Sequence, residues 1–216
     1  MVEQKLNTNL PGTLITLEGI DGCGKSTQAE YLIKRLQTNA INYLHVREPG
    51  GTGVGEAVRQ ILLDPGSSMS LQTEMLLYMA ARSELTGQVI LPALKKGLVV
   101  LCDRFTDSTA AYQGYGGGLE LGWIAQLNLK ATSGLKPDLT FLFDLPVEEA
   151  IKRRGDKADR LESRNINYHQ RVRRGYLELS QQEPQRFVVI DATGAQSQIH
   201  EAVWAAVVSF IAQEKG

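Results

Sequence analysis

The segment from Gly19 to Ser26, with the sequence GIDGCGKS, constrains this chain more than any other feature. It follows an apolar run at residues 13–18 and precedes a long segment with helical periodicity, so it occupies a strand-to-helix turn. Glycines let such a turn curl until its backbone N–H groups point at a phosphate, and the next helix presents its positive end to the same anion. A glycine-rich turn without a ligand is the alternative. The flanking segments and the G-x-x-x-x-G-K-S spacing both favour a phosphate-binding loop.

The side chains of this loop have separate expected tasks. Lys25 would reach the β- and γ-phosphates of a nucleotide, and the Ser26 hydroxyl would ligate Mg²⁺. A carboxylate among phosphates is costly unless a cation lies between them, so we expect Asp21 to be linked to Mg²⁺ or to an arginine. The predicted nucleotide-binding residues are Gly19, Ile20, Asp21, Gly22, Cys23, Gly24, Lys25, Ser26 and Thr27.

Composition excludes several functional classes. The 216 residues are expected to form a single domain spanning residues 1–216, and the formal net charge of −1 offers no overall field for nucleic acid or an anionic membrane. The longest apolar stretches, such as residues 203–211, are too short to span a bilayer, and residues 1–12 lack the apolar core of a signal peptide. Two cysteines do not make a disulfide framework, which favours a reducing compartment. We therefore expect a cytoplasmic protein without nucleic-acid or membrane partners.

Strand-like and helix-like segments alternate along the whole chain, which predicts an α/β fold. Runs such as LVVLC and TFLFD are apolar on both faces, as in a parallel sheet covered by helices on each side. The prediction is a three-layer sandwich with a five-stranded parallel sheet. Its strands are expected at residues 13–18, 43–47, 98–102, 140–144 and 186–190. Helices are expected at residues 24–38, 54–63, 71–96 with a break near Pro92, 119–133, 146–154, 164–182 and 196–213.

The residues around the loop favour group transfer over hydrolysis. Ligands of such sheets bind at the carboxyl ends of the strands, and Asp21, Arg47, Asp103, Asp144 and Asp191 all follow strand ends. The chain contains no N-K-x-D guanine motif and no LSGGQ transporter motif. After the third strand the acid is followed by arginine, in place of the glutamate that polarises water in many ATPases.

Three motifs together resemble bacterial thymidylate kinases: GIDGCGKST, REPGGT at residues 47–52 and DRF at residues 103–105. The resemblance runs from about Leu14 to Asp191. It implies the P-loop nucleoside monophosphate kinase fold, with transfer of the γ-phosphoryl group of ATP to dTMP, giving dTDP and ADP in dTTP synthesis. It also implies a homodimer formed through helices around residues 54–89. The alternatives are another nucleoside or nucleoside monophosphate kinase, or a non-catalytic ATP-binding regulator or motor subunit.

Tyr78 and Arg82 are candidates for recognition of the acceptor base. They are four residues apart, so on a helix they share one face, where an aromatic ring can stack on a base and a guanidinium can hydrogen-bond its edge. Without the resemblance, core packing for Tyr78 and a solvated charge for Arg82 are the simpler interpretation. The resemblance implies that Tyr78 stacks on thymine and that Arg82 contacts the base. The family more often has phenylalanine at the first position.

Asp103 and Arg104 have different expected partners. A carboxylate beside the loop can hold Mg²⁺ through water, whereas the neighbouring arginine suits the phosphate of the acceptor. A salt-bridged surface pair is the alternative. The resemblance also places Arg47, Glu48 and Pro49 in the substrate site.

The segment at residues 108–114 resembles the S-x-x-A-Y-Q segment of the family. The resemblance implies that Ser108 and Gln113 contact the base, and that Tyr112 stands near the 2′ position of the sugar. A ring there could exclude a ribose hydroxyl. A core tyrosine is the alternative.

A segment rich in both charges, residues 152–163, follows the fourth strand and its helix; we call it the basic segment. Charge runs usually form a solvated face, but the resemblance implies a lid. Members with an arginine in the P-loop do not need one from the lid, and this chain has Gly22 there. Arg153, Arg154 and Arg160 are therefore the candidate catalytic arginines, together with Lys25 and Asp21. The adenine is expected near Arg154 and the backbone of residues 191–194.

Overall fold

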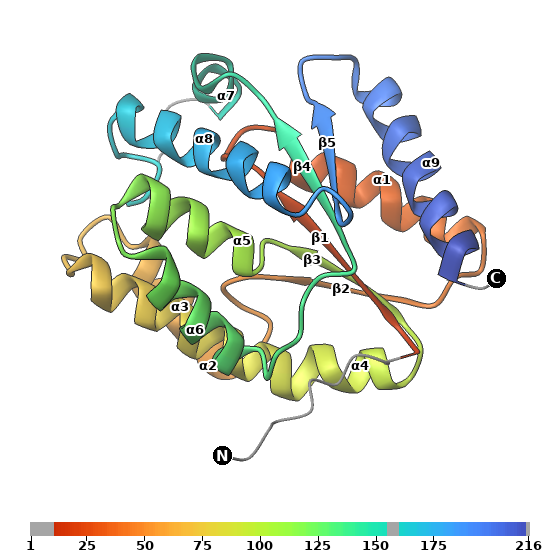
Figure 1. Cartoon of the computed structure of the whole chain (residues 1–216), viewed down its shortest axis with the longest axis horizontal. Coiled ribbons are helices and arrows are strands. Elements are labelled where there is room, and N and C mark those ends of the chain that lie inside the picture. The colour runs from red at the N-terminus through yellow and green to blue at the C-terminus, as the bar shows by residue number, and fades with distance from the viewer. Residues whose placement is uncertain (1–10, 155–159, 215–216) are drawn as a thin grey trace.

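A parallel sheet of five strands organises the part of the chain that the computed structural model describes, residues 11–154 and 160–214 (Figure 1). The spatial order is β2-β3-β1-β4-β5, and every neighbouring pair is parallel. The strands predicted from the sequence are confirmed, with bounds that differ by at most one residue. They are β1 Thr13–Glu18, β2 Tyr43–Arg47, β3 Val99–Asp103, β4 Leu139–Asp144 and β5 Phe187–Asp191.

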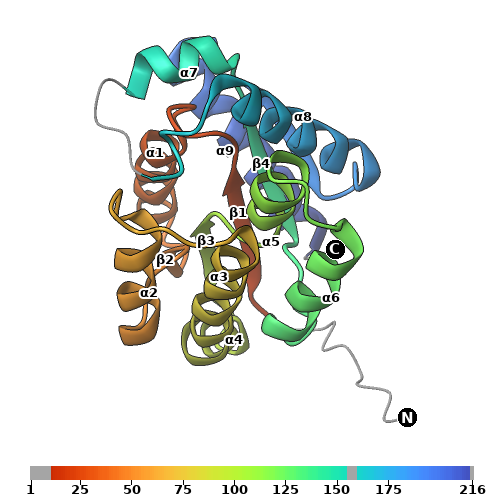
Figure 2. The same cartoon turned by 90° about the vertical axis from the view of Figure 1, so that its left-hand side faces the viewer.

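Helices cover both faces of this sheet, so the predicted three-layer α/β sandwich is confirmed (Figures 1 and 2). Helices α1 and α9 pack on one face, and α3, α4 and α8 pack on the other. The elements are α1 Lys25–Thr38, α2 Gly53–Leu63, α3 Leu71–Leu85, η1 Thr86–Ile90, α4 Leu91–Lys95, α5 Thr106–Thr109, η2 Ala110–Gly116, α6 Leu121–Ala131, α7 Val147–Arg154, α8 Ile166–Gln182 and α9 Gln196–Glu214.

Alternate residues of the central strands enter two different apolar clusters. Ile15 of β1 packs in the cluster that contains Leu32 of α1, whereas Leu14 packs in the cluster that contains Leu94 of α4. All of these side chains are buried. Because successive side chains of a strand point to opposite faces, each central strand needs apolar residues on both. Burial of one such side chain stabilises the fold by about 1.5–3 kcal/mol.

The helical region at residues 71–95 contains a π-helical turn that the sequence located only approximately. A break near Pro92 was expected, but the chain stays helical and widens into η1, just before α4. Proline has no N–H to donate and its ring crowds the preceding turn, and a wider turn relieves this conflict.

No helix among the described residues is long and apolar enough to cross a membrane.

Helices α5 and η2 were not predicted. They follow β3 directly and carry the sequence TDSTAAYQGYG, whose glycines and threonines are poor helix formers. Packing against α8 supports them instead.

The order of the strands places a crevice above β1 and β3. These strands are neighbours, but the helices that follow them lie on opposite faces of the sheet. Ligands of open α/β sheets bind at such a switch point, at the carboxyl ends of the strands.

Candidate active site

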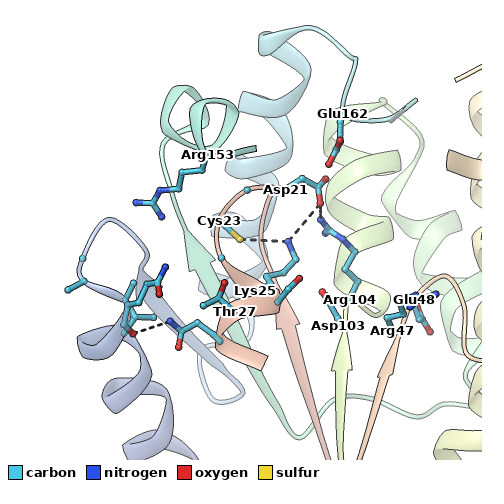
Figure 3. Close-up of a pocket in the computed structure, with 18 of the residues that line it drawn as sticks. Asp21, Cys23, Lys25, Thr27, Arg47, Glu48, Asp103, Arg104, Arg153 and Glu162 are labelled. Carbon is cyan, nitrogen blue, oxygen red and sulfur yellow. Dashed lines mark hydrogen bonds and ion pairs between the residues drawn. The ribbon is translucent and has the colours of Figure 1, made fainter. Parts of the chain in front are cut away.

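A cavity of about 910 Å³ lies at the carboxyl ends of β1 and β3, as Figure 3 shows. We call it the larger cavity. Its wall combines the loop after β1, the ends of β2 and β3, the end of α7 and the beginning of α9. The lining residues are Asp21, Gly22, Cys23, Gly24, Lys25, Ser26, Thr27, Gln28, Arg47, Glu48, Arg59, Asp103, Arg104, Arg153, Glu162, Gly194, Ala195, Gln196 and Ile199.

The loop after β1 has the backbone geometry of a phosphate cradle. Gly24 has φ 98°, a left-handed conformation that glycine adopts without strain, and α1 begins at the next residue. Gly22 has φ 86°, and a Cβ there would lie 2.3 Å from the carbonyl oxygen of Ala150 in α7. The loop therefore has no room for an arginine at this position.

Lys25 is buried inside the curl of the loop. Its Nζ donates to the carbonyl oxygens of Gly19 and Ile20, at 3.0 and 3.1 Å, and lies 4.0 Å from Asp21 Oδ1. The ammonium is thus held at the floor of the larger cavity, close to the N-terminus of α1. The positive charge of the lysine and the positive end of the helix dipole therefore lie close together, as in sites that bind phosphate.

Asp21 and Arg104 form an ion pair across the crevice, between Oδ1 and Nη2. Tyr112 joins them, since its hydroxyl donates to Asp21 Oδ2 at 2.9 Å and accepts from Arg104 Nη2 at 3.1 Å. Burial alone would raise the pKa of Asp21, but Arg104 and Lys25 outweigh it and hold that pKa well below its usual range. Asp21 is therefore a carboxylate near neutral pH, and it is linked to an arginine, one of the two partners expected from the sequence.

Arg104 itself adopts a left-handed backbone conformation, with φ 68°. Non-glycine residues take this conformation rarely, and strain of this kind concentrates at functional sites. Its Nη1 donates to Gly19 O, Ser108 Oγ and Tyr176 Oη at 3.1 to 3.2 Å. The guanidinium is thereby fixed between the two sides of the crevice.

A second cavity of about 90 Å³ adjoins the first, and we call it the smaller cavity. Asp21, Glu48, Arg59 and Arg104 line both, so the two cavities meet at these four charged residues. The complete lining is Asp21, Glu48, Pro49, Arg59, Leu63, Tyr78, Arg104, Ser108, Thr109, Tyr112, Gln113 and Leu161.

Most of the residues predicted to bind the acceptor come together around this smaller cavity. Those that line it are Glu48, Pro49, Tyr78, Arg104, Ser108, Tyr112 and Gln113. Arg47 lines the larger cavity instead and forms an ion pair with Glu56, 3.0 Å from Nη2 to Oε2.

Arg82 lies behind the cavity wall and lines neither cavity. Its side chain is 1 % exposed, which contradicts a solvated charge. Nε and Nη2 lie 2.7 and 2.6 Å from Glu48 Oε2, Nη1 donates to Thr109 and Asn128, and Nη2 also donates to Phe105 O. All five N–H donors of the guanidinium have protein acceptors. The contact of Arg82 with the base therefore stays a prediction, and in this structure the guanidinium holds Glu48 and Thr109 in the wall of the smaller cavity.

The arginines of the basic segment differ in position; residues 155–159 of that segment lie outside the described residues. Arg153 lines the larger cavity and donates to Ala192 O at 3.0 Å. Arg154 lines neither cavity and lies 3.9 Å from a carboxylate oxygen of Glu162. Arg160 lines neither and pairs with Glu74 at 2.7 Å. Of the three arginines, Arg153 is therefore the one that lines a cavity.

The two residues predicted to ligate Mg²⁺ lie in the wall of the same cavity. Ser26 and Asp103 both line the larger cavity, and Asp103 Oδ1 is buried without a hydrogen-bond partner among the described residues. A buried carboxylate oxygen without a partner is costly, and a cation or its water would satisfy it. No cluster of three or more acidic, histidine or cysteine side chains was found in the described ranges. This donor set fits Mg²⁺, which needs one or two protein oxygens beside phosphates and water.

Arg59 was missed by the sequence analysis. It lies on α2, and its Nη1 donates to Pro49 O at 3.1 Å, which directs the guanidinium into both cavities. The sequence carried one signal for Arg59. Thr52 can cap a helix, and Gly55 and Arg59 are four residues apart, so they share one face of that helix. In the structure, Gly55 on this face packs against Gly50.

Comparisons with known proteins agree with this geometry. Residues 17–203 match the sequence profile of the family described as thymidylate kinase. The chain is 50% identical over 201 residues to a thymidylate kinase of Desulforudis audaxviator, covering 92% of this chain and 91% of that protein. It is 47% identical over 191 residues to one of Kosmotoga olearia, covering 88% and 92%. A crystal structure of thymidylate kinase from Ehrlichia chaffeensis superimposes with a TM-score of 0.73 at 35% identity, covering 91% of this chain and 98% of that one. The chain belongs to the thymidylate kinase family.

Proposed function

We propose that this chain transfers the γ-phosphoryl group of ATP to dTMP, producing dTDP and ADP. The observation that carries the proposal is the pair of adjoining cavities, which meet at Asp21 and Arg104. One cavity contains the phosphate loop, and the other contains an aromatic side chain and a buried amide, the groups that recognise a base. Membership of the thymidylate kinase family supports both the phosphotransferase activity and the identity of the two substrates.

ATP is assigned to the larger cavity. Its phosphates would bind the loop and Lys25, and its adenine would lie near Gly194 and Ile199, which also line this cavity. This location differs in one detail from the sequence-based expectation, because Arg153 lines the cavity and Arg154 does not. Ser26 and Asp103 would hold Mg²⁺, which neutralises phosphate charge when bound.

The acceptor nucleotide is assigned to the smaller cavity. Its phosphate would lie where the cavities meet, beside Arg104 and Arg59, because guanidinium groups bind phosphate with paired hydrogen bonds. Its base would stack on Tyr78 and meet the amide of Gln113. Tyr112 is 5% exposed and fixed by Asp21, so its ring is a rigid wall that suits exclusion of a ribose 2′-hydroxyl.

The residues present can support this transfer without a general base. The second pKa of a phosphate monoester is about 6, so the attacking oxygen is already mostly unprotonated near neutral pH. What the site must supply is alignment of donor and acceptor and neutralisation of the charge on the transferred group. Lys25 and Arg153 are positioned for the donor phosphates, and Arg104 for the acceptor.

The proposal is tested by an acceptor panel in a coupled ADP-release assay with ATP. The acceptors are dTMP, dUMP, UMP, CMP and thymidine, and Lys25→Ala serves as the inactive control. We expect dTMP to give the highest kcat/KM and the ribonucleotides to be poor acceptors, because of the wall made by Tyr112. Preference for UMP or CMP would identify a different nucleoside monophosphate kinase. ATP turnover that is independent of any acceptor would exclude the proposed transfer.

We also propose that the chain forms a homodimer through α2, α3 and α6, which lie side by side on one flank of the molecule (Figure 2). Large apolar side chains are exposed on all three helices: Val54, Ile61, Leu76, Leu121 and Leu129. Exposed apolar side chains on neighbouring helices favour an association surface. The expected compartment remains the cytoplasm, and both cysteines are free and buried.

A further inference from the structure

Glu74, in the first turn of α3, is a fully buried carboxylate outside the lining of both cavities. It interacts with three side chains that come from two other parts of the chain. Oε2 accepts from Arg164 Nη2 at 2.6 Å and lies 2.7 Å from Arg160 Nη1, and Oε1 accepts from Gln113 Nε2 at 2.9 Å. A buried carboxylate is tolerated when it is paired and hydrogen-bonded in this way.

The two arginines hold one short turn, residues 160–164, against the core. Arg160 also donates from Nε to Leu62 O at 2.8 Å, and the backbone N–H of Arg164 donates to Leu161 O at 3.2 Å. Two of the residues between the arginines form cavity walls, since Leu161 lines the smaller cavity and Glu162 lines the larger one. Glu74 thus anchors a turn that contributes to both cavities.

The third partner of Glu74 is Gln113, whose amide is assigned to the base of the acceptor. A side-chain amide can turn over and exchange its donor for its acceptor, and the bond to Glu74 removes this freedom. Because the carboxylate only accepts, Nε2 of Gln113 must point towards it. The carbonyl oxygen Oε1 is then left to meet a donor on the base.

We propose that Glu74 is a positioning residue for the acceptor site. Its carboxylate sets the orientation of the Gln113 amide and fixes residues 160–164 at the wall of the smaller cavity. The proposal rests on the proposed function, because it assigns the smaller cavity to dTMP. It predicts an effect on acceptor binding that a purely structural contribution does not produce.

The test is steady-state kinetics of Glu74→Gln, which keeps the shape of the side chain but removes its charge and lets it donate as well as accept. We expect the KM for dTMP to rise about tenfold and the KM for ATP to change less than about twofold. Loss of stability alone would lower the active fraction and leave both KM values unchanged. Glu178→Gln is the matched control, because Glu178 lies in a surface pair with Arg174 and lines neither cavity. A KM for dTMP within about twofold of the wild type would overturn the proposal.

Hydrogen exchange provides a readout that does not depend on the substrate. Glu74→Gln should accelerate exchange of the amides in residues 160–168, and Glu178→Gln should not. If the wild type fails to phosphorylate dTMP, the proposed function fails, and the exchange result still decides whether Glu74 anchors this turn.

A second variant applies if Glu74→Gln does not fold. Arg164→Gln removes one of the two ion pairs at a partly exposed position and should also raise the KM for dTMP. Unchanged exchange and KM in Arg164→Gln would then refute the anchor.

Discussion

At the scale of single residues, the site is built on buried charge. Glu18, at the end of β1, is fully buried beneath Arg104 and accepts three hydrogen bonds: from Phe105 N at 2.7 Å, Ser108 Oγ at 2.6 Å and Tyr176 Oη at 2.8 Å. Burial, helped by the negative charge of Asp107, raises the pKa of Glu18 to about 7, although Arg104 and the hydrogen bonds act in the opposite direction. The Asp21–Arg104 pair thus lies above an acid that titrates near neutral pH.

Glu18 should make the stability of the protein depend on pH. Its pKa rises from 4.5 to about 7 on folding, so the unfolded chain loses this proton at a lower pH than the native protein. The contribution of Glu18 to stability is therefore complete below pH 4.5 and falls, by an amount on the order of 3 kcal/mol, as the pH rises to about 7. Glu18→Gln should remove this dependence.

Urea unfolding of the wild type and of Glu18→Gln at about pH 5 and about pH 8 measures this effect. The difference between the two proteins cancels the other titrating groups, including Asp21. Because the pKa of Asp21 is lowered on folding, this carboxylate stabilises the native protein when the pH is above the usual pKa of an aspartate. That contribution is lost as the pH falls. A difference in unfolding free energy between the two proteins that stays constant with pH would contradict the assignment.

At the scale of elements, the basic segment contains arginines with two different tasks. Arg153, in the last turn of α7, lines the larger cavity, while Arg160 is held by Glu74 and precedes Leu161, which lines the smaller one. Similar side chains in one charged run therefore separate into a candidate for the donor phosphates and a candidate for support of the acceptor site. The difference arises from the position of Arg153 on α7, because this helix directs the Arg153 side chain towards Ala192 and the larger cavity.

Arg153→Ala should lower kcat by about 10³-fold and change the KM for dTMP only slightly, since an arginine on the transferred phosphoryl group stabilises mainly the transition state. Arg160→Ala should instead raise the KM for dTMP. Single-turnover and steady-state kinetics with ATP and dTMP distinguish the two patterns. Unchanged turnover in both variants would eliminate the basic segment as a source of catalytic charge.

At the scale of the whole molecule, the apolar flank formed by α2, α3 and α6 predicts a dimer. Light scattering of the wild type should give about twice the chain mass of 23.8 kDa. Ile61→Asp places a charge in the flank, where Ile61 is 47% exposed, and should shift the protein towards monomer. Val208→Asp on α9, at 46% exposure, is the matched control on another surface and should remain dimeric. A monomeric wild type would refute the dimer.

Much of the fold could be predicted because its signals are local. Each strand is an apolar run with its own boundaries, and the phosphate loop lies within nine consecutive residues whose geometry is set by glycine and by the start of a helix. Local sequence signals are therefore sufficient to predict the layers, the loop and the class of chemistry. Helices α5 and η2 escaped prediction because their stability comes from packing against α8, which no local pattern contains.

The separate roles of the charged residues become visible only in the folded chain. Arg82 and Arg104 were both expected to contact the acceptor. Arg82 is enclosed by Glu48, Thr109, Asn128 and Phe105, whereas Arg104 lines both cavities. Long-range packing also defines Glu74, since its partners Gln113 and Arg164 lie 39 and 90 residues away along the chain. The function of a charged side chain depends on its surroundings in space, because burial and neighbouring charges determine its pKa and the groups that it can contact. The packing of the helices on the sheet determines which residues become neighbours.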